Sequence, residues 1–102
     1  MNQLSEYIVQ AIKDGDSKAF EDVFRQYYNP LLNLAGGILK DEAAAEEQVQ
    51  HVFIKLWEHR SNLKEDVKLF PYLLTGVRNR CYNYIRDQAV VKRYIDRQLQ
   101  QY

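Results

Sequence analysis

The segment from Asp41 to Arg60 constrains the fold more than any other part of the chain, because its apolar residues recur with the period of a helix. Asp41 is suited to cap the N-terminus of this helix, and the acidic residues that follow favour the positive end of the helix dipole. Spacings of three and four place the following residues in one apolar stripe: Ala45, Val49, Val52, Phe53, Leu56 and Trp57. We therefore expect this helix to pack against the rest of the chain.

The opposite face of the same helix carries Glu47, Gln50, His51, Ile54 and Glu58. Ile54 is unusual there, because a rotation of about 100° per residue points a large aliphatic side chain into a polar face. An exposed apolar residue among charges is a small indication of a docking surface. Single exposed apolar residues are also common on ordinary surfaces, and Ile54 alone favours that simpler interpretation.

Two further helices are predicted before this segment. One spans residues 4–13, and a second runs from residue 17 to about residue 38. Pro30 lies inside the second helix and predicts a kink or a break just before it, because proline lacks the backbone N–H and clashes with the preceding turn. The apolar stripe predicted for the first helix is Leu4, Tyr7, Ile8, Ala11 and Ile12.

After the central helix, residues 61–68 predict a polar loop, and the pair Phe70-Pro71 predicts the start of another helix. Residues 88–102 are compatible with a last helix or with a frayed linker. No long segment alternates with period two, so we expect an all-α fold, a small bundle of three to five helices. Residues 1–87 would form the folded domain, and residues 88–102 its C-terminal extension.

Composition and charge exclude several classes of function. A single cysteine, Cys81, allows no disulfide within the chain and no cysteine zinc cluster, and its place in an apolar stripe indicates inert core. His51 and His59 do not share a helix face, so we expect no metal site and no cofactor. No nucleophile motif and no phosphate-binding glycine loop is present, so we expect no enzymatic activity. With no signal peptide and no long apolar run, we expect a soluble cytoplasmic protein without membrane insertion.

The charged residues are unevenly distributed although the formal net charge is zero. Residues 41–66 hold seven acidic and three basic residues, whereas residues 78–97 hold six basic and two acidic ones. The helix from Phe70 therefore offers donors for phosphates and base edges, with tyrosines between them that suit stacked, unpaired bases. A solvated helix face with its tyrosines packed on the bundle explains the composition equally well.

Three blocks of the sequence resemble region 2 of the extracytoplasmic-function sigma factors of bacterial RNA polymerase. The blocks are GDSKAFEDVFRQYYNPLLNLA, AAEEQVQHVFIKLWEHR and YLLTGVRNRCYNYIRD, and they match in order and spacing over roughly residues 12–87. The acidic pair with Val49-Gln50 in the middle block and the pair Arg78-Asn79 in the third are the most specific elements.

The resemblance implies a transcription initiation factor domain that recognises and helps to melt the promoter −10 element. The central helix would dock on the clamp helices of the largest subunit of core RNA polymerase, through Glu47, Gln50, His51 and Ile54. The helix from Phe70 and the loop before it would engage the non-template strand of the −10 DNA. The DNA-binding candidates are Asn62, Lys64 and Lys68 in the loop and Arg78, Asn79, Asn83 and Arg86 in the helix. Arg78 and Asn79 are predicted to form the floor of a pocket for an unpaired base. An anti-sigma factor would be a further partner.

This chain departs from the family pattern at several positions. His51 stands where an acidic residue is usual, and Gln48 stands where an aliphatic residue is usual. Thr75 and Gly76 replace basic and aliphatic residues, which weakens both the basic surface and the helix. The family also carries a second helical domain, region 4, toward which residues 88–102 would lead and which these 102 residues do not include. The alternative function is a helical protein-interaction module, for example one bound by an anti-sigma factor, that does not bind DNA.

Overall fold

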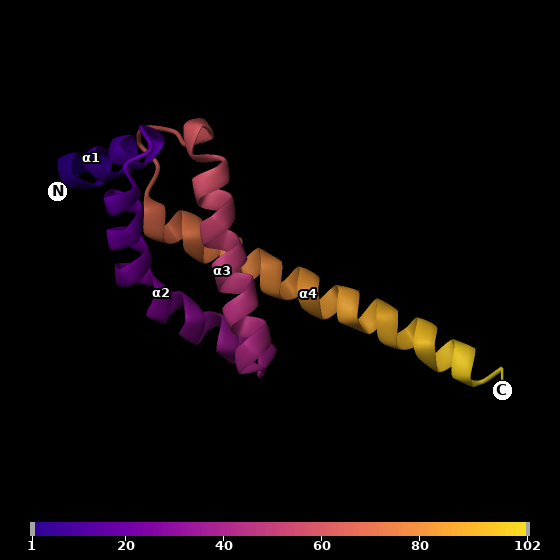
Figure 1. Cartoon of the computed structure of the whole chain (residues 1–102). Helices are drawn as coiled ribbons and strands as arrows, with labels where there is room; N and C mark the ends of the chain where they lie inside the picture. The colour runs from indigo at the N-terminus through magenta and orange to yellow at the C-terminus, as the bar shows by residue number, and fades with distance from the viewer. Residues whose placement is uncertain (1, 102) are drawn as a thin grey trace.

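The fold is a small helical bundle from which one long helix projects (Figure 1). The computed structural model describes the backbone of residues 2–101 and the side chains of residues 7–101. The elements are α1 (Asn2–Lys13), α2 (Ser17–Leu39), α3 (Glu42–Glu58), a short 3-10 helix η1 (Arg60–Asn62) and α4 (Leu69–Leu99). The all-α prediction is confirmed. None of the helices within residues 2–101 combines the length and apolar character needed to cross a bilayer.

Caps and special backbone conformations set the helix boundaries. Asp16 caps α2 by accepting hydrogen bonds from the backbone N–H groups of Lys18 and Ala19, at 3.0 and 3.2 Å. Asp41 caps α3 in the same way through Ala44, at 3.0 Å. Between these helices Lys40 adopts a left-handed conformation with φ of 56°. Its backbone N–H donates a hydrogen bond to the carbonyl of Gly36 and so caps the C-terminus of α2. The turn from α2 into α3 is therefore short and fixed.

Helix α2 runs through Pro30 without a break. The predicted break is therefore wrong, and the other predicted outcome, a change of direction, is visible in the middle of α2 in Figure 1. Pro30 is exposed whereas Leu31 and Ala35 are fully buried. Packing of the residues after the proline against the bundle offsets the lost backbone hydrogen bond.

The core lies where α2, α3 and α4 meet. The predicted stripe of α3 is buried with the exception of Trp57, which is half-buried. Phe53 is the centre of an aromatic cluster, with ring centroids 4.8 Å from Phe24 and 6.4 Å from Phe20. In α1 the core residues are Val9 and Ile12, while Tyr7 is 73% exposed. Ile12 is thus buried as predicted and Ile8 and Ala11 are half-buried, whereas Tyr7 faces solvent and Val9 takes a place in the core that was not predicted for it. The Leu4 prediction lies outside the described side chains.

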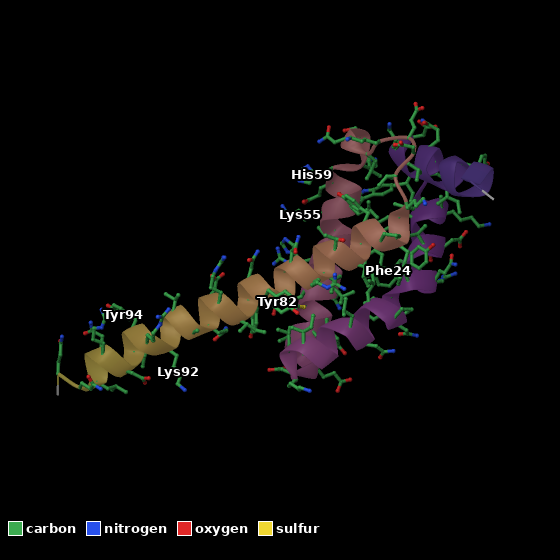
Figure 2. All side chains as sticks on the ribbon, turned by 180° about the vertical axis from the view of Figure 1, so that it is seen from behind. Phe24, Lys55, His59, Tyr82, Lys92 and Tyr94 are labelled. Atoms are coloured by element: carbon green, nitrogen blue, oxygen red, sulfur yellow. The ribbon has the colours of Figure 1, made fainter. Side chains whose placement is uncertain are left out.

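Helix α4 continues far beyond the bundle. Its first half buries Leu69, Leu73, Val77 and Cys81, and its second half extends into solvent, as the projecting segment with Tyr94 and Lys92 shows in Figure 2. Residues 88–99 are thus helical, which was one of the two alternatives expected, and they continue α4 without a break. Val91, Ile95 and Leu99 extend the apolar stripe of α4 past the point where α2 and α3 end, and all three are exposed.

Candidate functional site

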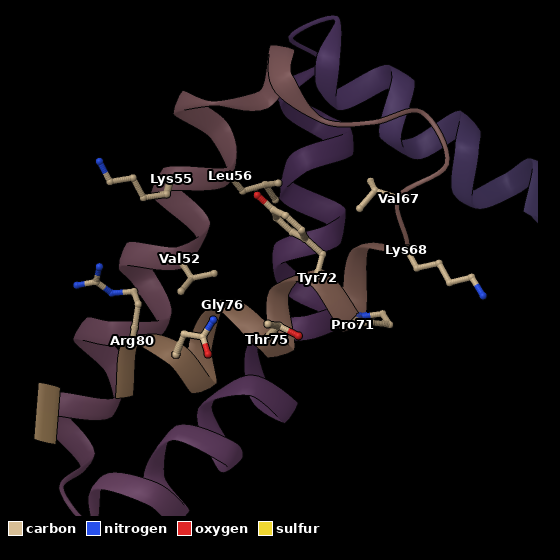
Figure 3. Close-up of a pocket in the computed structure, with 11 residues that line it drawn as sticks. Val52, Lys55, Leu56, Val67, Lys68, Pro71, Tyr72, Thr75, Gly76 and Arg80 are labelled. Carbon is tan, nitrogen blue, oxygen red and sulfur yellow. The ribbon is translucent and has the colours of Figure 1, made fainter. Parts of the chain in front are cut away.

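Helix α3 forms a ridge between two grooves. The first, here called the α3–α4 groove, is an open hollow of about 720 Å³ between α3, the loop of residues 63–68 and the first half of α4 (Figure 3). Its lining residues are Val52, Lys55, Leu56, Val67, Lys68, Pro71, Tyr72, Thr75, Gly76, Asn79 and Arg80. The groove therefore combines an apolar floor with a border of polar and basic side chains.

The floor exists because a small residue of α4 faces α3. A Cβ atom added to Gly76 would lie 3.4 Å from Cγ1 of Val52, in ordinary van der Waals contact. A larger side chain at residue 76 would fill the space. Tyr72 stands on the same face of α4 as Gly76, one turn earlier, and Figure 3 shows its ring between α3 and the loop. An aromatic ring, 47% exposed, beside an apolar hollow offers a surface on which a planar base can stack.

The loop that closes one side of this groove is held to the bundle at two points. Leu63 is buried in the core and Val67 is half-buried, while Lys64, Glu65 and Asp66 are exposed between them. The backbone N–H of Val67 donates to the carbonyl of Lys64 at 3.1 Å and makes the loop a compact turn. The loop thus presents charged side chains outward without being detached from the fold.

The border of the groove contains a contact that the sequence did not reveal. Arg80 of α4 donates a hydrogen bond from Nε to Oε1 of Gln48 on α3, at 3.0 Å. Gln48 is 5% exposed and is the one buried polar residue among the side chains of residues 7–101. The sequence singled out Gln48 only as a glutamine where the family usually has an aliphatic residue, and the tertiary fold brings Arg80 to it.

The predicted DNA-binding residues fall into two groups. Lys68 and Asn79 line the α3–α4 groove. The others, Asn62, Lys64, Arg78, Asn83 and Arg86, are exposed and do not line it. Arg78 was predicted to form part of the pocket floor, but it does not line the groove. Arg78 and Asn79 are consecutive residues of α4, so their side chains point in directions about 100° apart. The floor is formed by Val52, Leu56 and Gly76 instead.

The predicted polymerase-binding residues lie on the outer face of α3. Glu47, Gln50 and Ile54 are exposed, and His51 is half-buried. Ile54 and Gln50 also border the second groove, here called the α2–α3 groove, which has a volume of about 610 Å³. Its other lining residues are Ser17, Phe20, Phe24, Phe53, Trp57 and Glu58. Ile54 is therefore the edge of an aromatic-lined hollow and not an isolated apolar residue.

His51 lies on the side of the ridge that faces Arg80. Burial lowers the pKa of His51 from its usual value, and the positive charges of Arg80 and Lys55 lower it further, while Glu58 and Glu47 raise it. These effects favour the uncharged imidazole, because its protonation would add a cation near Arg80 and Lys55. Burial also raises the pKa of the Cys81 thiol, which is fully buried in the core, so that residue is an unreactive thiol.

Comparison with known proteins shows the family of the chain. Residues 23–91 match the family model described as "Sigma-70 region 2". The chain is 24% identical over 90 residues to a protein of Myxococcus xanthus named RNA polymerase sigma factor CarQ, and this match covers 88% of the chain. The chain spans about half of that relative, 52% of its length. No solved structure matches the chain significantly.

Proposed function

Since the chain belongs to the sigma-70 region 2 family, we propose that it acts in transcription initiation as a domain of the extracytoplasmic-function type. In this proposal the outer face of α3 docks on the clamp helices of core RNA polymerase. The α3–α4 groove takes up an unpaired base of the non-template strand of the promoter −10 element, and so helps to hold the promoter open. The observation that carries the proposal is the groove itself, where apolar floor, aromatic wall and basic border meet.

The chemistry of the groove suits an extruded base better than a base pair. A base that leaves the stack loses a few kcal/mol of stacking and pairing energy, and the protein must offer stacking and edge contacts in return. Tyr72 offers a ring, Val52 and Leu56 offer apolar surface, and the amide of Asn79 can donate to and accept from a base edge. Lys68 lies at the border of the groove, where a phosphate of the same strand would pass.

The outer face of α3 suits a protein partner. Glu47 is exposed and has no ion pair among the side chains of residues 7–101. Ile54 is 53% exposed beside the aromatic α2–α3 groove. An apolar anchor next to a charge that fixes orientation is the usual arrangement of a docking surface.

The strand-binding part of the proposal is tested with the whole chain and a random-sequence library of single-stranded DNA. An enriched oligonucleotide is then compared with scrambled versions by fluorescence anisotropy. We expect Tyr72→Ala and Asn79→Ala to abolish the sequence preference, and Tyr94→Ala, an exposed tyrosine outside the groove, to preserve it. A preference that survives both groove variants would remove the α3–α4 groove from strand recognition.

The loop is tested separately. Replacing residues 64–66 by glycine and serine leaves the buried Leu63 and the half-buried Val67 in place, so we expect the fold to be preserved. We expect a weaker preference for the enriched strand and unchanged binding to core polymerase. Unchanged strand preference would show that these loop residues form only a connection between α3 and α4.

The alternative proposal, an interaction module held by an anti-sigma factor without DNA binding, is favoured by one observation. The projecting half of α4 leaves Val91, Ile95 and Leu99 uncovered. Enrichment from the single-stranded library and a pull-down with bacterial core polymerase distinguish the two proposals. A pure interaction module would enrich no strand from the library and would not retain core polymerase.

A further inference from the structure

Arg80 holds a charge that the fold orients but does not neutralise. Its side chain is half-buried at the border of the α3–α4 groove, and no ion pair within residues 7–101 involves it. Its hydrogen-bond acceptor there is an uncharged amide oxygen, that of Gln48 at 3.0 Å. A partly desolvated cation without a carboxylate attracts an anion more strongly than a fully solvated one.

The geometry of the contact leaves the right donors free. The bond to Gln48 uses Nε of Arg80, so the four N–H groups on Nη1 and Nη2 stay available for another acceptor. A guanidinium binds the oxygens of a phosphate through such paired donors. Lys55 borders the same groove, but it already lies 3.5 Å from the carboxylate of Glu58.

We propose that Arg80 binds a phosphate of the single strand whose base enters the α3–α4 groove, and that Gln48 is the positioning residue that holds Arg80 there. This inference rests on the proposed strand-binding function and adds the residue that fixes the backbone of the strand. Gly76, Asn79 and Arg80 follow one another along the groove side of α4, so a base beside Asn79 has its own phosphate within reach of Arg80.

The identity of residue 48 matters in this account. An amide orients the guanidinium and leaves its positive charge intact. A carboxylate at the same place would accept the same hydrogen bond but would neutralise the charge, and an aliphatic residue would leave Arg80 without an anchor. Glutamine is thus the side chain that orients Arg80 while keeping it free to bind an anion.

The test compares Gln48→Glu, Gln48→Leu and Arg80→Gln with the wild type, in the whole chain, on the oligonucleotide enriched from the random single-stranded library. We expect Arg80→Gln and Gln48→Glu each to weaken binding at low salt by about tenfold or more, the loss expected for one charge-assisted contact. The log–log salt slope should become shallower by about 0.7, the value of one phosphate contact to a single strand. Arg97→Gln, on the projecting end of α4, is the matched control and should change binding little.

A double-mutant comparison separates positioning from general stability. Gln48→Leu should weaken binding in the wild type and have no further effect in Arg80→Gln, because Gln48 acts only through Arg80. Thermal melting checks that the variants fold. The NMR signal of the Arg80 Nε–H should move away from its wild-type position in Gln48→Leu, which loses the hydrogen bond. In Gln48→Glu the signal should still report a hydrogen-bonded N–H, because the carboxylate accepts the same bond.

The outcomes distinguish this inference from the function on which it rests. If the wild type enriches no strand, the proposed function fails and the inference fails with it. If the wild type binds its strand with sequence preference while Arg80→Gln and Gln48→Glu bind equally well, only the inference is overturned. Weaker retention of core polymerase by Arg80→Gln with unchanged strand binding would also overturn it, and would assign Arg80 to the docking surface.

Discussion

Replacing Gly76 by alanine should make the domain more stable and its groove less able to hold a base. Glycine inside a helix costs about 0.8–1.0 kcal/mol relative to alanine, and Gly76 has a helical conformation in the first half of α4. The added methyl group would lie 3.4 Å from Cγ1 and 3.9 Å from Cγ2 of Val52, so no atom has to move. We expect a gain of about 1 kcal/mol in the free energy of unfolding.

The matched control is Gly37→Ala, in the last turns of α2. Gly37 is exposed, and a Cβ atom there would meet no atom within 4 Å. Both variants should raise the melting temperature by roughly 4–8 °C, the shift that 1 kcal/mol produces in a domain of this size. Circular dichroism melts and urea titrations measure the effect.

The two variants should differ in strand binding. The methyl group of Gly76→Ala takes up part of the space in the α3–α4 groove, and the larger side chain of Gly76→Leu fills it. We therefore expect Gly76→Ala to bind the enriched single strand more weakly than the wild type, and Gly76→Leu to bind it more weakly still. Gly37→Ala should bind like the wild type. A Gly76→Ala protein that is less stable than the wild type would contradict the packing of α4 against Val52. A Gly76→Leu protein that folds and binds the strand normally would show that no base enters this groove.

Three other substitutions test separate parts of the account. Phe53→Ala should lower the free energy of unfolding by about 3–5 kcal/mol, because the ring is buried at the centre of the aromatic cluster; a loss below 1 kcal/mol in urea titrations would contradict that packing. Glu47→Lys should weaken retention of bacterial core polymerase with little change in melting temperature, and Asp22→Lys, an exposed acid on α2, should not; equal retention would exclude Glu47 from the docking face. The pKa of His51 is lower in the native protein than in the unfolded chain, where it is about 6.5. Once the pH falls below about 6.5, the unfolded chain therefore binds more protons than the native protein. The free energy of unfolding should decrease as the pH is lowered from about 6.5 toward the pKa of the native protein. His51→Gln should flatten this part of the stability profile, and an unchanged profile would show that His51 is not its source.

Most of the fold could be predicted from the sequence because the apolar periodicity of α3 is strong. Asp41 caps α3 as expected, and the stripe from Ala45 to Leu56 is buried. The errors occurred where packing decides between similar local patterns. Tyr7 and Val9 both suit a helix face, but only the fold shows that Val9 faces the core and Tyr7 faces solvent. At Pro30 the sequence left a kink or a break open, and packing of the residues after the proline into the bundle keeps α2 continuous.

The candidate site was predicted in part. Helical geometry identified the outer face of α3, including Ile54, but not the aromatic hollow beside it, since that hollow needs α2. Lys68 and Asn79, two of the DNA-binding candidates, both line the α3–α4 groove, and their role in DNA binding stays a prediction. The pair of Gln48 and Arg80 was missed, because the two residues lie 32 positions apart and no local pattern links them. The sequence signal for this pair was Gln48 itself, a glutamine at a position where the resembled family usually has an aliphatic residue.

The central claim is that one unpaired base enters the α3–α4 groove, and methyl NMR tests it most directly. The methyl groups of Val52, Leu56 and Val67 line this groove, and those of Val90 and Val91 lie on the exposed half of α4. The account predicts that the enriched oligonucleotide shifts the first set strongly, that a scrambled oligonucleotide does not, and that the second set stays unchanged. Binding of the enriched strand without shifts at Val52, Leu56 and Val67 would contradict the claim.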